Sequence, residues 1–191
     1  IDPEEIIQNY GADSARLFIL SDSPPEKDVQ WSDEGINSSF KFLQKLWVLN
    51  QKIIEEINRE HPQNSSNDLE KITNRFILNV QNNIETFSYN KIIANFHETY
   101  SLLNNLIKNK IDKVTWTDNY KKILITMSPV IPHFANECLS KLEINNRTEE
   151  NYWPKINKNI LIEDKVNFVI QINGKKRDVY HIDKDTSEKE L

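Results

Sequence analysis

Apolar residues recur at steps of three and four from Asp33 to about Glu60, the spacing that one face of an α-helix requires. The stripe consists of Ile36, Phe40, Leu43, Trp47, Ile54 and Ile57, widened by Leu46 and Ile53. Ser32 precedes two acidic residues and is therefore expected to cap the start of this helix. The pattern predicts a long amphipathic helix that places Trp47 in a hydrophobic core.

The same spacing predicts further helices, at about residues 68–86, 88–107 and 119–142. Residues 109–118 are expected to form a loop in which Val114 and Trp116 touch the other helices. The last helix is expected to kink or break at Pro129 and Pro132, because proline has no backbone N–H to donate. Four amphipathic helices joined by short links predict a four-helix bundle.

A short helical connector is expected before the bundle. Asp2 and Pro3 are suited to the N-cap and first position of a short helix, and Gly11 is suited to end it because glycine tolerates a positive φ. A second short helix follows and is expected to end before Pro24-Pro25.

The last part of the chain has the pattern of a β-hairpin. Residues 166–172 read as a strand, Asn173-Gly174 as a two-residue turn, and residues 175–182 as the return strand. Such a turn pairs Ile172 with Lys175, Ile170 with Arg177 and Phe168 with Val179. Residues 187–190 resemble a capping box that opens a helix. The family resemblance described below implies that the hairpin begins a truncated small α/β domain.

These patterns predict a mainly α protein with four regions. They are a connector at 1–31, the helical bundle at 32–142, a linker at 143–165 and the start of the truncated α/β domain at 166–191.

Composition limits the possible functions. The net charge of the 191 residues is −5, so contact with RNA requires a local basic face. The three glycines are too far apart for a glycine-rich phosphate loop. One cysteine excludes an internal disulfide, and no segment approaches the roughly 18 apolar residues of a membrane span, so a cytoplasmic location is expected. The chain starts at Ile1 without methionine, which favours a cut from a longer polypeptide.

Three groups of basic residues are candidates for contact with RNA. Lys41, Lys45 and Lys52 share one face of the long helix and either follow a phosphate backbone or form a solvated surface. Arg16 either contacts RNA or forms an ion pair with Asp13 or with a loop acid. The run Lys175, Lys176 and Arg177 beside the hairpin turn either grips phosphates or keeps an edge strand soluble.

The sequence offers no candidate for catalysis or metal binding. The four histidines lie far apart in the sequence without a cysteine or histidine at ligand spacing, so no metal is predicted. His133 follows Pro132 at a helix start and is expected to be structural. Cys138 lies on a helix that faces the hydrophobic core, and it is expected to be a buried small side chain rather than a nucleophile.

Several motifs occur in a fixed order along the chain. They are Tyr10-Gly11-Ala12-Asp13, Ala15-Arg16-Leu17-Phe18, the loop from Pro24-Pro25-Glu26 to Trp31, the segment from Phe42-Leu43 to Trp47, Ser128-Pro129-Val130-Ile131-Pro132-His133, and Trp153-Pro154 followed by Val169 to Lys175. In this order they resemble the region of class I leucyl-tRNA synthetases that directly follows the KMSKS loop. Methionyl, valyl and isoleucyl enzymes share the first motif, and the loop favours the leucyl family.

The resemblance implies an anticodon-binding-type bundle that positions leucine-accepting tRNA for the catalytic domain of the same polypeptide. It implies ATP and Mg²⁺ in that catalytic domain, and neither a cofactor nor catalytic activity in the residues present here. DNA and membranes are not expected partners. The alternatives are a helical protein-interaction module without RNA affinity and the same region of a methionyl, valyl or isoleucyl enzyme.

Overall fold

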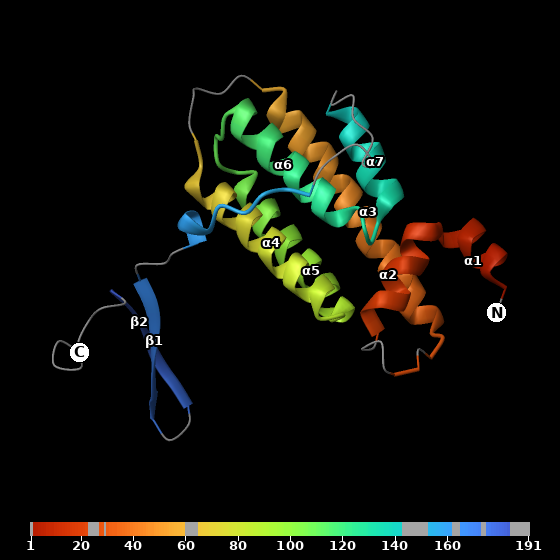
Figure 1. Cartoon of the computed structure of the whole chain (residues 1–191), viewed down its shortest axis with the longest axis horizontal. Coiled ribbons are helices and arrows are strands. Elements are labelled where there is room, and N and C mark those ends of the chain that lie inside the picture. The colour runs from red at the N-terminus through yellow and green to blue at the C-terminus, as the bar shows by residue number, and fades with distance from the viewer. Residues whose placement is uncertain are drawn as a thin grey trace. The chain divides into compact units, whose positions relative to one another are not determined.

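The computed structural model describes residues 2–22, 27–28, 30–59, 65–142, 153–161, 165–172 and 175–183. The chain divides into two compact units, Ile1–Ile156 and Asn157–Leu191. The first unit contains the helices α1 to α7, and the second contains a short 3-10 helix and a β-hairpin (Figure 1). The predicted mainly α architecture is confirmed.

The helices of the first unit are α1 (Pro3–Tyr10), α2 (Ala12–Asp22), α3 (Asp33–Ile57), α4 (Asn67–Glu85), α5 (Tyr89–Leu106), α6 (Lys113–Met127) and α7 (Pro132–Lys141). Helices α3 to α6 form the four-helix bundle, in which α3 and α4 each contact both α5 and α6. Helix α2 packs on α3 and α5, and α7 packs on α6, α3 and α2 (Figure 1). The predicted connector therefore lies directly against the bundle.

Local signals explain where several helices begin and end. The Asp2 carboxylate accepts the Glu4 amide at 2.9 Å, and Gly11 ends α1 with φ of +80°. The Ser32 hydroxyl accepts the Gly35 amide at 3.1 Å, as predicted for the start of α3. Residues at these ends therefore satisfy part of the unpaired backbone groups of each helix.

The buried stripe of α3 differs from the predicted one. The buried apolar residues of α3 are Ile36, Phe42, Leu46, Leu49, Ile53 and Ile57. Trp47 was predicted in the core, but it is only half-buried and packs its ring at 6.4 Å from Phe134, below the Lys141 ammonium at 4.0 Å. Two apolar stripes run along α3, and contacts with α2, α5, α6 and α7 decide which of them is covered most fully.

The predicted loop at 109–118 is also wrong. Helix α6 already begins at Lys113, because Asp112 caps it by accepting the Thr115 amide at 2.9 Å. Trp116 is fully buried within this helix, whereas Val114 is 77% exposed. Asp112 followed by Thr115 was a capping signal that the apolar pattern obscured. The predicted break after Met127 is confirmed, and α7 resumes at Pro132.

The second unit contains the 3-10 helix η2 (Lys158–Leu161) and the antiparallel strands β1 (Lys165–Ile172) and β2 (Lys175–Asp183). The predicted pairing of Ile172 with Lys175 is confirmed, but a β-bulge follows between Ile170 and Gln171. Arg177 is the extra residue of β2, so Ile170 pairs with Asp178 instead of Arg177, and Phe168 pairs with Tyr180 instead of Val179. A bulge cannot be recognised from the alternation of polar and apolar residues along a strand. The sequence pattern therefore did not predict it.

Some predictions fall outside the described residues. These are the Pro24-Pro25 break, the Asn173-Gly174 turn, the capping box at 187–190 and most of the linker at 143–165. The four region boundaries therefore stay a prediction. None of the helices in the described part of the chain is long and apolar enough to cross a membrane.

Candidate nucleic-acid interface

Lys41, Lys45 and Lys52 are all exposed on α3, on a strip that runs beside the face that Phe42 and Leu46 bury. Steps of four and seven residues keep side chains on one strip of a helix, so the three ammonium groups share a direction. Among the described residues, no acidic side chain forms an ion pair with these lysines. This lysine row therefore presents uncompensated positive charge on a protein with an overall negative charge.

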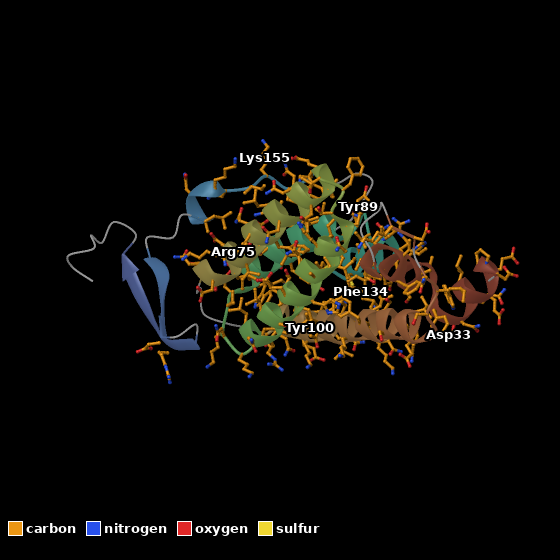
Figure 2. All side chains as sticks on the ribbon, turned by 90° about the horizontal axis from the view of Figure 1, so that it is seen from below. Asp33, Arg75, Tyr89, Tyr100, Phe134 and Lys155 are labelled. Atoms are coloured by element: carbon orange, nitrogen blue, oxygen red, sulfur yellow. The ribbon has the colours of Figure 1, made fainter. Side chains whose placement is uncertain are left out.

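A hollow of about 340 Å³ adjoins two lysines of the row. It is lined by Lys41, Gln44, Lys45 and Val48 from α3 and by Tyr100 from α5. Figure 2 shows Tyr100 where α5 passes alongside α3. The structure thus brings together two of the predicted lysines with an aromatic residue that was not among the candidates for contact with RNA.

An aromatic cluster packs behind the ring of Tyr100 that lines this hollow. The rings of Phe42 and His97 are stacked with centroids 3.7 Å apart, and Tyr100 meets Phe42 edge to face at 6.0 Å. Burial, and then the positive charge of Lys45, lower the pKa of His97. The imidazole is therefore neutral at pH 7, and the positive charge beside the hollow rests on the lysines.

Arg16 has a contact that neither sequence interpretation anticipated. Its Nε donates to the Val130 carbonyl at 2.8 Å, and its Nη2 donates to the Pro129 carbonyl at 2.7 Å. These carbonyls belong to the turn between α6 and α7. The alternative ion pair with Asp13 is not formed in the described structure, since Asp13 pairs with His133.

Asp13 caps α7 from another helix. Its Oδ2 accepts the Phe134 amide at 2.7 Å, and its Oδ1 lies 2.9 Å from Nδ1 of His133. The carboxylate is 4% exposed. Because Ile131 at the N-cap of α7 has no side-chain acceptor, Asp13 supplies the missing one. His133 is thus held in a structural contact, as its position after Pro132 predicted.

The basic residues of the hairpin belong to the second unit. Lys175 and Lys176 lie on β2 opposite Ile172 and Gln171, next to the bulge that contains Arg177. Arg177 is exposed. Contact of this run with RNA stays a prediction.

Another hollow, of about 890 Å³, has different walls. It lies between α1, α3 and α7 and is lined mostly by apolar side chains, among them Ile7, Phe40, Leu43, Trp47 and Phe134. Carbon walls of this kind offer little to phosphate oxygens, which bind cations and N–H groups. We therefore place the candidate interface at the lysine row and not at this groove.

Cys138 is a buried side chain and not a surface nucleophile. Cys138 is fully buried, and burial raises the pKa of its thiol to about 12, so the reactive thiolate is scarce at neutral pH. Among the described residues, no three His, Cys, Asp or Glu side chains lie close enough together to hold a metal ion.

Comparison with known proteins shows which family the chain belongs to. The sequence model of the family described as "Anticodon-binding domain of tRNA ligase" matches residues 66–191. The chain belongs to this family. The matched residues run from α4 to β2. The lysine row on α3 therefore lies before the matched part of the chain.

Longer matches include the lysine row. Leucine–tRNA ligase of Prochlorococcus marinus strain AS9601 is 36% identical over 194 residues, which cover 100% of this chain and 22% of that enzyme. Leucine–tRNA ligase of Bradyrhizobium sp. strain ORS 278 is 37% identical over 188 residues, which cover 93% of this chain and 22% of that enzyme. The chain thus spans about a fifth of the length of these relatives.

A solved structure shares the fold. The ternary complex of LeuRS, tRNA and LeuAMS from Agrobacterium radiobacter K84 contains a region that matches 99% of this chain with a TM-score of 0.80. The sequence identity is 20%, and the match covers 25% of that chain. This likeness supports the arrangement of the helices in the anticodon-binding domain.

Proposed function

We propose that this chain is the tRNA-binding portion of a leucine–tRNA ligase. The observation that carries the proposal is the similarity to leucine–tRNA ligases over the whole chain, which extends beyond the general family match at both α1 and α3. The protein-interaction module is not favoured by these comparisons, and neither are the methionyl, valyl and isoleucyl enzymes.

The lysine row supplies the physical basis for RNA binding. An exposed ammonium group without an acidic partner attracts a phosphate and releases condensed counterions from the RNA. Lys41, Lys45 and Lys52 lie along about 16 Å of α3, at 1.5 Å of rise per residue. Such a strip contacts the backbone of tRNA and contributes orientation rather than sequence readout.

We propose different roles for the remaining candidate residues. Lys175, Lys176 and Arg177 are proposed as a second phosphate contact, with exposed Arg177 as its best-supported member. Arg16 already donates to two carbonyls of the α6–α7 turn. We propose that it acts mainly by holding this turn, so its contribution to RNA binding is smaller than that of the lysine row.

Aminoacylation itself is assigned to the rest of the longer enzyme. Neither this assignment nor the need for ATP and Mg²⁺ rests on a side chain of the described residues. We propose that the catalytic domain of the same polypeptide binds ATP and Mg²⁺, while the present domain holds the body of leucine tRNA. We propose that the enzyme acts in the cytoplasm.

A filter-binding titration tests the proposal. The chain should bind a leucine tRNA transcript with an affinity that falls steeply as salt increases, because phosphate contacts release counterions. Isoleucine and methionine tRNA transcripts serve as competitors and should displace leucine tRNA less well than unlabelled leucine tRNA. Absent binding, or binding that does not change with salt, would instead support a protein-interaction module.

A further inference from the structure

The hollow between α3 and α5 combines the groups that hold one nucleotide. Its volume of about 340 Å³ lies at the lower end of the range for small-molecule sites, about 300–1,000 Å³. Two cationic side chains, one amide, one apolar side chain and one phenol ring line it: Lys41, Lys45, Gln44, Val48 and Tyr100. The ammonium groups suit a phosphate, and the amide carries both a donor and an acceptor for a base edge.

The ring of Tyr100 is positioned before any ligand arrives. Tyr100 is half-buried and packs edge to face on Phe42, whose other partner is the stacked imidazole of His97. Because these contacts fix the ring plane, little conformational entropy remains to be lost when a flat ligand stacks on it. Val48, which is 49% exposed, offers the same ligand an apolar edge.

These features favour an unpaired nucleotide over a paired one. A base within a duplex is covered by its neighbours, whereas an unpaired base exposes its π-face to an aromatic side chain. Basic residues next to an aromatic ring are the usual means of holding single-stranded nucleic acid. We propose that this hollow binds one unpaired nucleotide of the RNA, with its base on Tyr100 and its phosphate between Lys41 and Lys45. The inference rests on the proposed function, since it names the part of tRNA that this surface recognises.

The test measures dissociation constants of Tyr100→Leu for two RNAs, a leucine tRNA transcript and a blunt RNA duplex. Stacking on one base contributes about 1–3 kcal/mol, so the variant should bind tRNA between about 5- and 150-fold more weakly. Duplex affinity and the salt slope for tRNA should not change, because no phosphate contact is removed. Tyr100→Phe should bind tRNA like the wild type, since it retains the ring.

Two further variants separate a local effect on the hollow from a folding effect. Val48→Phe fills the hollow from an exposed position without changing charge, and it should weaken tRNA binding but not duplex binding. Tyr89→Leu removes a tyrosine eleven positions earlier on α5, about 16 Å away along the helix, and should leave both affinities unchanged (Figure 2). Figure 2 places these two tyrosines well apart on the helix.

The outcomes distinguish this site from the proposed function. A wild-type chain that binds tRNA in a salt-dependent manner, together with Tyr100→Leu and Val48→Phe variants that bind equally well, would overturn the nucleotide site and leave the proposed function intact. Equal losses for tRNA and duplex would also overturn it, because they show a structural role for Tyr100. Absent wild-type binding would overturn both.

Discussion

Tyr120 and Asn50 form a polar contact inside the helical core. The Tyr120 hydroxyl on α6 donates to Oδ1 of Asn50 on α3 at 3.0 Å, and both side chains are buried. Within the described residues, the amide nitrogen of Asn50 has no hydrogen-bond partner. This contact therefore ties α3 to α6 at the cost of one unpaired donor.

Replacing Tyr120 by Phe should destabilise the fold by about 1–3 kcal/mol, because the buried Asn50 carbonyl then lacks a donor. Urea unfolding measures the change. Asn50→Leu in the same background should restore part of the loss, since it removes the stranded amide. Tyr89→Phe, a change at a half-buried tyrosine, should alter stability by less than about 0.5 kcal/mol. A Tyr120→Phe loss no larger than this control would contradict the role of the contact.

Alkaline pH should destabilise the fold through Cys138. Burial raises the pKa of this thiol from 9.0 to about 12, so the stability that the buried neutral thiol contributes is fully present below pH 9. It is lost as the pH rises from 9 toward 12, by up to about 4 kcal/mol for a shift of this size. Tyr120, whose pKa burial also raises, adds to the loss above pH 10.

Unfolding of the wild type and of Cys138→Ala at several pH values from 7 to 11 measures this effect. The stability difference between the two proteins should shrink above pH 9, because only the wild type has a buried thiol to ionise. A stability difference that stays constant up to pH 11 would show that the pKa of the thiol is not raised in the folded state.

At the scale of elements, α2 holds the break between α6 and α7 with two side chains of opposite charge. Arg16 donates to carbonyls at the end of the turn, and Asp13 accepts amides at the start of α7. The residues are three apart, which places them on neighbouring positions of one helix face. This arrangement explains why a helix interrupted by Pro129 and Pro132 keeps a defined geometry.

Asp13→Ala should therefore loosen α7 in particular. We expect a loss of about 1–3 kcal/mol, from a lost cap and from buried amides left without an acceptor. Hydrogen exchange at the Phe134 amide should accelerate in the same variant, while exchange in α4 changes little. Asp118→Ala removes an exposed carboxylate from α6 and serves as the control. Unchanged exchange at Phe134 would refute the capping role.

How much of the fold the sequence predicts depends on how local the signal is. Helix starts at Asp2 and Ser32 follow from neighbouring residues and were predicted correctly. The core stripe of α3 was misplaced because several helices compete to cover its apolar residues. The capping of α7 by Asp13 joins residues 120 and 121 positions apart, so only the folded arrangement reveals it.

The candidate site was predicted in part for the same reason. The lysine row depends on helical spacing alone, and its exposure follows once α3 forms. Tyr100 was not a candidate in the sequence, because only the packing of α5 on α3 brings its ring to Lys41 and Lys45. The bulge at Arg177 likewise depends on strand pairing rather than on the residues of β2.

Across the whole molecule, the proposed RNA-binding surface is a small positive strip on a protein with a net charge of −5. The overall charge repels a polyanion, so binding requires that lysines on one strip act together. If this is correct, equal losses of positive charge elsewhere on the surface must matter much less.

The most direct test compares the salt dependence of leucine tRNA binding by two triple variants. Lys41→Ala, Lys45→Ala and Lys52→Ala remove the row, while Lys71→Ala, Lys91→Ala and Lys113→Ala remove the same charge from exposed positions on α4, α5 and α6. Each phosphate contact adds about 0.9 to the slope of log affinity against log salt. The first variant should bind more weakly with a slope reduced by up to about 2–3, and the second should retain the wild-type slope. Equal slopes for the two variants would contradict the assignment of the row to tRNA.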